Sequence, residues 1–377
     1  MLLCVAFGQR AIFFGIIKLK TYKHLFERVC SFENLYIAYL RASKGKRFKP
    51  DVDRFNYNLE HELIQTEKEL LDGSYQPGVY HQFLIHEPKE CLISAAPFRD
   101  RVVHHAIHQV IEPIFDRRFI YDSYACRLGK GTHSAVRRFK EFLRYNSYVL
   151  KCDIQKYFPS IDHEILLSLI HKRIKDEKLM DLIVKIVSNR PPDPLSDVPQ
   201  WFSSDDLFST LNRPRGIPIG NLTSQFFANI YLHELDAFVK YELHEKYYIR
   251  YVDDLVILGN DKKHLHKVKE QIRDFLQGLR LRLHPKKSNV FPVRVGTDFL
   301  GYRIYPDHSR IRKENVKRFI TRTKRLQLDY SCGKITLDKV RSSIHSWLGH
   351  AKHADSYKLR RKLLGSFHFM RKNVHVY

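Results

Sequence analysis

The sequence feature that most constrains the fold is a pair of adjacent aspartates, Asp253 and Asp254, between two apolar, β-prone runs. Residues 247–252 and 255–259 predict two strands, which places both carboxylates at the tip of a tight hairpin. Carboxylates at a turn contribute little to a hydrophobic core, but they suit a hard divalent cation at a strand end. Acidic turns are common in proteins of every kind, so this interpretation needs independent support.

A third aspartate has the same setting. Residues 148–152 form an apolar run that leads directly into Asp153, and Phe158 and Pro159 follow before a predicted helix. Because Asp153 and Asp253 lie far apart in the sequence, only a tertiary fold can bring the three carboxylates together. Their shared setting at strand ends favours a metal-dependent site over a plain acidic turn.

The charge of the chain points to a polyanionic partner. Lys and Arg number 65 against 41 Asp and Glu, which gives a formal net charge of +24. More than half of this excess lies in residues 301–377, which hold 19 basic and 5 acidic side chains. Nucleic acid is the first candidate partner, and an anionic membrane surface is the second.

The cysteines and the N-terminal residues bear on whether the chain is a metal-binding, disulfide-linked or membrane protein. Six cysteines are scattered without a Cys-x-x-Cys pair, which argues against a zinc module or a disulfide framework and fits a reducing, cytoplasmic compartment. The apolar stretch 1–17 is interrupted by Gln9 and Arg10 and is too short to span a membrane. We therefore interpret residues 1–30 as an N-terminal extension and expect no membrane partner.

Two loops around these aspartates have features of ligand-binding turns. Gly129 and Gly131 bracket Lys130, with Arg127 just before them and a predicted helix just after, which is a plausible anion-binding turn. Gly216 and Gly220 precede another predicted helix, residues 226–243, and would let a ligand approach the backbone closely. A predicted hairpin over residues 80–94 carries Lys89 near its tip.

The order of these motifs resembles that of the reverse transcriptases. An Asp153 strand is followed by Gly-Ile-Pro-Ile-Gly at 216–220, Tyr-Val-Asp-Asp at 251–254, a Lys286-Lys287 turn and Phe-Leu-Gly-Tyr at 299–302. Within that class, the chain looks most like the reverse transcriptases of diversity-generating retroelements, which are related to retron and group II-like enzymes. The cue is Ile-Gly-Asn-Leu-Thr-Ser-Gln at 219–225, where most reverse transcriptases have Gln-Gly-x-x-x-Ser-Pro.

The resemblance implies an α+β, right-hand polymerase fold with fingers, a palm built on an antiparallel sheet, and a helical thumb. N-terminal helices and fingers would occupy residues 31–145. The palm would occupy 146–305, with a fingers or loop insertion at about 165–215. The basic helical thumb would occupy 306–377 and clamp the template–primer through its phosphates.

The resemblance also implies roles for individual residues. Asp153, Asp253 and Asp254 would be catalytic and would hold two Mg²⁺ ions, which Mn²⁺ could replace, with Asp254 the more peripheral ligand and the Ile154 carbonyl a further contact. Nucleotide binding would involve Lys89, Arg127, Lys130, Phe158, Ile219, Gly220, Gln225 and Lys287. Phe158 would be the gate against a 2′-hydroxyl, and Lys287 the proton donor to pyrophosphate. Leu300, Gly301 and Tyr302 would form the primer grip.

Ile219 carries the expectation about fidelity. It stands where most relatives place a glutamine against the incoming nucleotide, and its side chain has no donor or acceptor, so selectivity should fall. The expected function is error-prone copying of a template RNA into cDNA that diversifies a target gene, with errors opposite template adenine as the resemblance implies. The implied partners are template RNA, primer or cDNA, deoxynucleotides and a small basic helical accessory protein, itself an oligomer.

Two alternatives remain open from the sequence. One is a retron or phage-defence reverse transcriptase that makes a defined cDNA, which an even spread of copying errors would favour. The other is a nucleic-acid-binding protein with an inactive polymerase fold. The intact aspartates Asp153, Asp253 and Asp254 argue against the second alternative.

Overall fold

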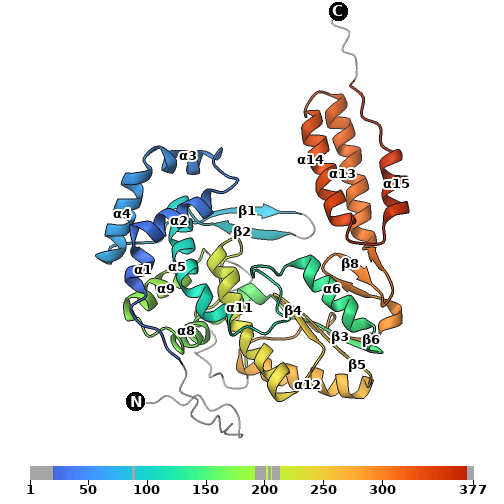
Figure 1. Cartoon of the computed structure of the whole chain (residues 1–377), viewed down its shortest axis with the longest axis horizontal. Helices are drawn as coiled ribbons and strands as arrows, with labels where there is room; N and C mark the ends of the chain where they lie inside the picture. The colour runs from blue at the N-terminus through green and yellow to red at the C-terminus, as the bar shows by residue number, and fades with distance from the viewer. Residues whose placement is uncertain (1–19, 87–89, 192–200, 203–204, 206–212, 372–377) are drawn as a thin grey trace, which may run out of the picture.

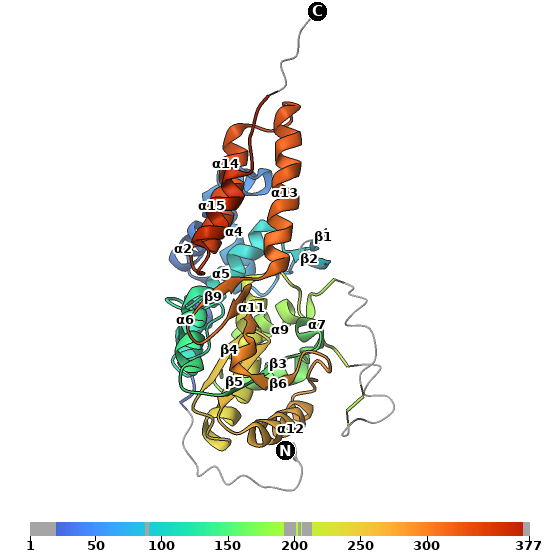
Figure 2. The same ribbon diagram turned by 90° about the vertical axis from the view of Figure 1, so that its right-hand side faces the viewer.

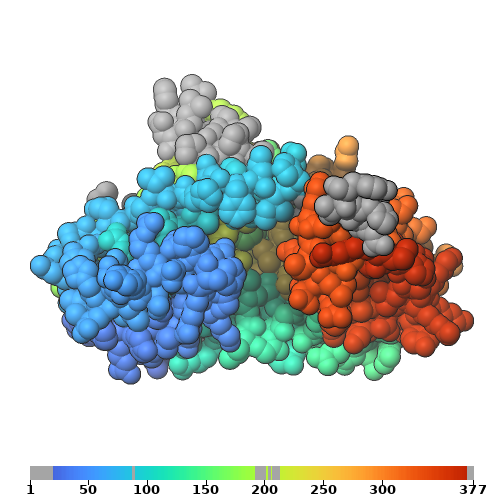
Figure 3. Space-filling view, turned by 90° about the horizontal axis from the view of Figure 1, so that it is seen from above, coloured from blue at the N-terminus to red at the C-terminus, as the bar shows by residue number. Residues whose placement is uncertain are grey.

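The computed structural model of this chain describes residues 20–86, 90–191, 201–202, 205 and 213–371. An N-terminal helical lobe and a C-terminal helical tower stand on opposite sides of a central antiparallel sheet (Figures 1 and 2). Seen from above, the molecule is hollowed between the lobe and the tower, and residues of the central part form the floor (Figure 3). This mixed arrangement of helices and strands confirms the expected α+β class.

The N-terminal lobe is built around one long buried helix. Its elements are α1 (Phe26–Cys30), α2 (Phe32–Ser43), α3 (Pro50–Tyr57), α4 (Leu59–Leu71), the antiparallel strands β1 (His81–Ile85) and β2 (Cys91–Ala95), and α5 (Phe98–Asp116). The packed structure begins before the boundary expected at residue 30, because Val29 and Cys30 of α1 are fully buried. The Asp176 carboxylate, which also caps α9 (Glu177–Ser188), accepts hydrogen bonds from the amides of Leu25 and Phe26.

The central sheet has the strand order β4-β5-β3-β6, and all of its pairings are antiparallel. The strands are β3 (Tyr148–Asp153), β4 (Tyr248–Tyr251), β5 (Asp254–Gly259) and β6 (Asn289–Pro292). Alternate residues face opposite sides. Leu150 and Ile257 join the core with α11 (Leu222–Ala237) and α12 (Lys262–Gly278), whereas Val149 and Val256 pack with α6 (Thr132–Leu143). Helices therefore cover both faces, so the ends of the strands remain for chemistry.

Shorter elements complete the central part. They are α7 (Tyr157–Ser160), α8 (His163–His171), the π-helix η1 (Phe238–Glu242), which continues α11, and the 3-10 turn η2 (Val293–Val295). Of the fingers or loop insertion expected at about 165–215, residues 192–200, 203–204 and 206–212 lie outside the described residues. Among the helices that the structure describes, none is long and apolar enough to cross a membrane.

The C-terminal tower rises from a small antiparallel sheet of β7 (Thr297–Phe299), β8 (Tyr302–Ile304) and β9 (Ser309–Ile311). Its helices are α13 (Lys313–Ser331), α14 (Leu337–Ala351) and α15 (Tyr357–Gly365). Phe319 of α13 stacks on Trp347 of α14 with ring centroids 3.8 Å apart, and both side chains are buried. This aromatic contact stabilises the packing of α13 against α14.

Candidate active site

The three aspartates meet at one end of the central sheet. Asp153 is the last residue of β3, Asp254 is the first residue of β5, and the two are directly paired in the strand register. Asp253 lies in the turn between β4 and β5, and its carbonyl accepts a hydrogen bond from the Ile154 amide at 3.3 Å. The antiparallel pairing of β3 with the β4–β5 hairpin therefore brings distant residues together, as the strand-end pattern predicted.

The turn that presents these carboxylates is strained. Val252 has φ +55°, a left-handed conformation that is rare for a β-branched residue. Strain of this kind costs on the order of 1–3 kcal/mol and persists only where surrounding contacts enforce it. The structure must therefore supply a support for this turn.

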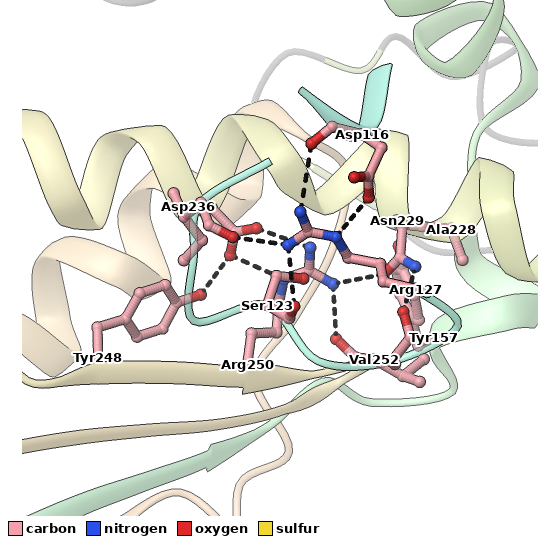
Figure 4. A network of polar contacts seen from close by, with 12 residues as sticks. Asp116, Ser123, Arg127, Tyr157, Ala228, Asn229, Asp236, Tyr248, Arg250 and Val252 are labelled. Carbon is pink, nitrogen blue, oxygen red and sulfur yellow. Dashed lines mark hydrogen bonds and ion pairs between the residues drawn. The ribbon is translucent and has the colours of Figure 1, made fainter. Parts of the chain in front are cut away.

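A buried ion pair supplies that support (Figure 4). The Arg250 guanidinium donates two hydrogen bonds of 2.7 Å to the Asp236 carboxylate, and neither side chain is exposed. Its remaining end donates to Asn229 Oδ1 at 3.0 Å and to the Val252 carbonyl at 3.3 Å. The Tyr248 hydroxyl donates a further hydrogen bond to Asp236 at 2.7 Å. The network thus ties α11 to the strained turn.

Our sequence reasoning missed this network, although it left a signal. Arg250 is a charged residue in the middle of the apolar run that forms β4, and Asp236 interrupts the apolar face of α11. Charged residues are almost never fully buried unless they are paired. Two such exceptions on neighbouring elements would have predicted a buried pair.

Two lysine ammonium groups lie against the aspartates. Lys287 Nζ is 3.0 Å from both carboxylate oxygens of Asp153. Lys151 Nζ is 3.3 Å from Asp254 Oδ1, which is buried and accepts no hydrogen bond in the structure. Lys287 was expected to contact the nucleotide; in this structure its ammonium neutralises Asp153, and the nucleotide contact stays a prediction. The position of Lys151 was not predicted, although a lysine within an apolar strand is a visible anomaly.

The electrostatics of the site favour additional positive charge. Burial, together with the negative charges of the neighbouring Asp254 and Asp153, raises the pKa of Asp253 to about 6. Burial also raises the pKa of Asp254, while the Lys151 ammonium opposes that change. The negative charge of these ionised carboxylates is therefore only partly balanced by positive charge nearby.

The donor set suits a hard divalent cation, because it consists of carboxylate oxygens, one of them buried without a hydrogen bond. Among the described residues, no group of three or more His, Cys, Asp or Glu side chains is arranged so that it could hold a metal ion as it stands. The two ammonium groups stand where cationic charge is needed. Binding of a divalent cation would therefore require the ammonium groups of Lys151 and Lys287 to move away from the carboxylates.

Arg127 does not reach toward the site, contrary to the prediction of a triphosphate contact. Its guanidinium donates to the Asp116 side chain at 2.6 Å and to the carbonyls of Ile120, Ser123 and Asp116 at 2.7, 3.0 and 3.2 Å. Figure 4 shows this side chain enclosed by the loop that follows α5. Four of its five N–H groups are used by the protein, so Arg127 organises the loop.

Lys130 is similarly engaged. Its ammonium lies 3.3 Å from the centroid of the Tyr121 ring and donates a hydrogen bond of 2.8 Å to the Tyr121 carbonyl. The loop is therefore held by its own cations, and the expected anion-binding turn does not present them to a ligand. Lys89, the third predicted basic contact, lies outside the described residues.

The segment around Ile219 joins the lobe to the central sheet. The amide of Ile217 donates to the Phe158 carbonyl at 3.1 Å, and the Ile219 carbonyl accepts from the Ser94 amide of β2 at 2.9 Å. Phe158 is half-buried and packs against the main core. Gln225 is exposed and accepts a hydrogen bond from the Cys126 thiol at 3.3 Å. These predicted nucleotide-binding residues thus surround a common backbone junction.

Gly220 has a packing role on one side. Its φ is +129°, and a Cβ at this position would lie 3.0 Å from Ile93 Cγ2 and 3.1 Å from the Ser94 carbonyl oxygen. Strand β2 therefore fills the space that a side chain would need, while the residue itself is exposed and its predicted contact with a ligand stays a prediction. Glycine is required at this position because any side chain would collide with Ile93 and Ser94 of β2.

Substitution Gly220→Ala is expected to destabilise the protein by about 1–3 kcal/mol, because alanine must adopt this positive φ and displace β2. Urea denaturation would measure the change. Gly349→Ala is the matched control, since nothing lies within 4 Å of a Cβ at that helical glycine; it should be neutral or stabilising by about 0.5–1 kcal/mol. Equal effects of the two substitutions would show that the contact with β2 is unimportant.

The predicted primer grip is the β7–β8 turn, which sits under the tower. Leu300 and Gly301 have φ +49° and +91° and form the turn itself. Tyr302 is fully buried, and its hydroxyl lies 2.9 Å from both His350 Nδ1 and the His350 carbonyl. Asn315 donates to the Gly301 carbonyl at 3.1 Å. Tyr302 therefore anchors the turn to α14 and is not available to touch a primer.

The fold and this site are those expected of a template-directed polymerase: an antiparallel sheet carries three aspartates at one end of its strands, and the molecule is hollowed between the lobe and the tower (Figure 3). Comparison with known families agrees. Residues 89–304, more than half of the chain, match the model described as reverse transcriptase (RNA-dependent DNA polymerase). The chain belongs to the reverse transcriptase family, and its architecture is that of a right-hand polymerase.

The chain is also similar to two curated proteins. Protein YkfC of Escherichia coli K12 is 28% identical over 332 residues, which cover 75% of this chain and 82% of that protein. The group II intron-encoded protein LtrA of Lactococcus lactis subsp. cremoris is 25% identical over 386 residues, which cover 82% of this chain and 60% of that protein. The chain thus spans less than two thirds of the length of LtrA.

Among solved structures, apo telomerase from Candida tropicalis aligns with a TM-score of 0.47 at 12% identity. The alignment covers 77% of this chain and 61% of the telomerase chain.

Proposed function

We propose that this reverse transcriptase is the error-prone enzyme of a diversity-generating retroelement. It would copy a template RNA into mutated cDNA that replaces a variable region of a target gene. The observation that carries the proposal is Ile219, within the run Ile-Gly-Asn-Leu-Thr-Ser-Gln at 219–225. Its backbone carbonyl is held by Ser94, while its half-buried side chain offers no hydrogen bond to an incoming nucleotide.

The proposed chemistry is displacement of pyrophosphate by a primer 3′-hydroxyl. Asp153, Asp253 and Asp254 would hold two Mg²⁺ ions, with the Ile154 carbonyl as a further contact, and the ions would neutralise charge on the attacking and leaving oxygens. Lys287 lies within hydrogen-bond distance of Asp153; once cations displace its ammonium from that carboxylate, Lys287 would hold or donate a proton beside the reacting phosphates. Phe158, half-buried against the core, remains the proposed gate against a 2′-hydroxyl.

The wider context is also a proposal. The tower would act as the thumb, the lobe with its β1–β2 hairpin would belong to the fingers, and the central sheet would be the palm. A small basic helical accessory protein would assist in the cytoplasm. A retron or phage-defence enzyme that makes a defined cDNA remains the second candidate, since it would share the same carboxylates.

Substitution Ile219→Gln is expected to reduce misincorporation about tenfold, because a polar contact to the nucleotide would be restored. Primer extension on a defined RNA template, followed by cDNA sequencing, would give the error rate for each template base. The unaltered chain should make its errors mainly opposite adenine. Ile219→Leu is the control, since it keeps an apolar side chain and should keep the error rate.

Two results would contradict the proposal. Evenly distributed errors in the unaltered chain would favour the retron or defence alternative. An error spectrum unchanged by Ile219→Gln would remove Ile219 as the cause of low fidelity.

A further inference from the structure

Helix α15 presents a basic face that plays no part in the proposed catalysis. Four exposed residues lie at positions one, two, five and six of the helix and so share one side of it. We call them the outer basic face; they are Tyr357, Lys358, Arg361 and Lys362. Together with Gly365 they line an open depression of about 590 Å³. Leu363, on the opposite side, is buried in the tower.

The charge of this face is not compensated by the protein. Within residues 20–86, 90–191 and 213–371, no carboxylate forms an ion pair with Lys358, Arg361 or Lys362. Residues 356–377 contain no Asp or Glu. The nearest acidic residue in the sequence, Asp355, is held by the Ser309 amide at 2.8 Å and lies 3.9 Å from Lys140. In the part of the chain that the structure describes, the face therefore has three cations and no carboxylate paired with them.

The outer basic face also points away from the hollow. Figure 1 shows α15 on the side of the tower farthest from the N-terminal lobe, beyond α13 and α14, and Figure 2 shows it in front when the molecule is viewed from that side. Because α15 buries its Leu363 side against the tower, its exposed side faces outward. A template–primer held in the hollow would not reach these residues, although the sequence predicted a template–primer clamp for the whole basic segment.

We propose that the outer basic face binds a single-stranded segment of RNA outside the polymerase hollow. Lys358, Arg361 and Lys362 would contact phosphates, and Tyr357, 68% exposed, would stack against a base. The combination of an exposed aromatic ring with cations along one helix face is the chemistry that recognises single-stranded nucleic acid. A basic protein partner would be repelled, so RNA fits this surface better than the accessory protein does.

The surface would let the enzyme hold a long RNA at a second point while copying another part of it. This role would suit any reverse transcriptase that must select one RNA. It does not depend on the proposed diversity-generating subclass.

The test is a binding measurement with the full chain. The triple variant Lys358→Gln, Arg361→Gln, Lys362→Gln would be compared with Lys262→Gln, Lys263→Gln, Lys267→Gln. The second set removes the same charge from exposed positions of α12. The probes would be a long folded RNA with unpaired loops and a short RNA–DNA duplex that the hollow can hold. Fluorescence anisotropy without deoxynucleotides makes the result independent of polymerase activity.

The α15 triple variant should bind the long RNA on the order of tenfold more weakly at low salt, with a shallower salt dependence, because three phosphate contacts are lost. Its affinity for the short duplex should remain within about twofold, as the contacts in the hollow are untouched. Tyr357→Ala should weaken binding of the long RNA by about fivefold or more, through lost stacking.

Three results would overturn the proposal. Equal losses for the α15 and α12 triple variants would mean that only net charge matters. A parallel loss for the short duplex would place α15 in contact with the template–primer. Unchanged binding of the long RNA would leave the face to an acidic protein partner.

Discussion

Substitution Asp253→Asn should reduce the rate of primer extension by at least about 10³-fold. A neutral amide cannot balance the charge of the divalent cations, and such cations stabilise the transition state by several kcal/mol. Asp253 lies in the turn just before Asp254, which pairs with Asp153 in the strand register, and its carboxylate is buried among like charges. Single-turnover extension of a labelled primer on an RNA template, with Mg²⁺ and then with Mn²⁺, would measure the loss.

The same substitution should not weaken the fold, which separates a catalytic effect from a structural one. The pKa of Asp253 is raised to about 6 in the folded protein, above its ordinary value of 3.8. The ionised carboxylate therefore costs stability above pH 6, and this cost disappears as the pH falls toward 3.8. A neutral asparagine removes the cost, so unfolding by urea at pH 7 should need at least as much denaturant as before.

Asp307→Asn makes the same chemical change on an exposed residue outside any strand, and it should leave the rate of primer extension unchanged. Retention of a normal rate by Asp253→Asn would contradict the assignment of the catalytic site. So would a loss of activity that merely followed a loss of folded protein.

Substitution Asp236→Ala is expected to destabilise the protein by about 3–5 kcal/mol, because it leaves the Arg250 charge buried without a partner. Both side chains are fully buried and joined by two hydrogen bonds of 2.7 Å. The Val252 carbonyl would lose a well-ordered donor, so the strained turn that carries Asp253 should relax as well. Equilibrium urea unfolding would measure the change in stability, and primer extension would report on the turn.

Two controls sharpen this prediction. The double variant Arg250→Met, Asp236→Leu removes both charges and should recover most of the lost stability, since apolar residues can replace a buried ion pair. Glu270→Ala breaks an ion pair with Arg273 on the exposed side of α12 and should cost no more than about 1 kcal/mol. A small effect of Asp236→Ala, comparable with that of Glu270→Ala, would contradict a supporting role for the pair.

The sequence correctly predicted that the three aspartates lie together, because strand ends have a simple geometry. An apolar run that stops at a carboxylate places that carboxylate at the end of a strand. Antiparallel pairing of β3 with β5 then aligns Asp153 with Asp254. The helices around the sheet could also be predicted from the sequence, because their apolar residues recur with helical spacing. The helix predicted over residues 226–243 forms as α11 and its continuation η1.

The basic and polar candidates were harder to assign. Arg127 and Lys130 have the composition of an anion-binding loop, yet their hydrogen bonds go to Asp116 and to carbonyls of their own loop. Tyr302 belongs to a motif that the resemblance assigned to the primer, yet its hydroxyl is taken by His350. In each case the partner comes from outside the motif, so the motif alone could not reveal whether the group was free.

The sequence by itself determined the class of chemistry: three acidic strand ends, their order along the chain, and a basic C-terminal segment suited to nucleic acid. Those features depend on local periodicity and on charge, both of which can be read directly. Only the tertiary structure decided which polar groups remain available to a ligand. A buried donor or acceptor must find a partner, and that partner can come from any part of the chain. The buried Asp236–Arg250 pair, the lysines against Asp153 and Asp254, and the outward direction of α15 all follow from such distant packing.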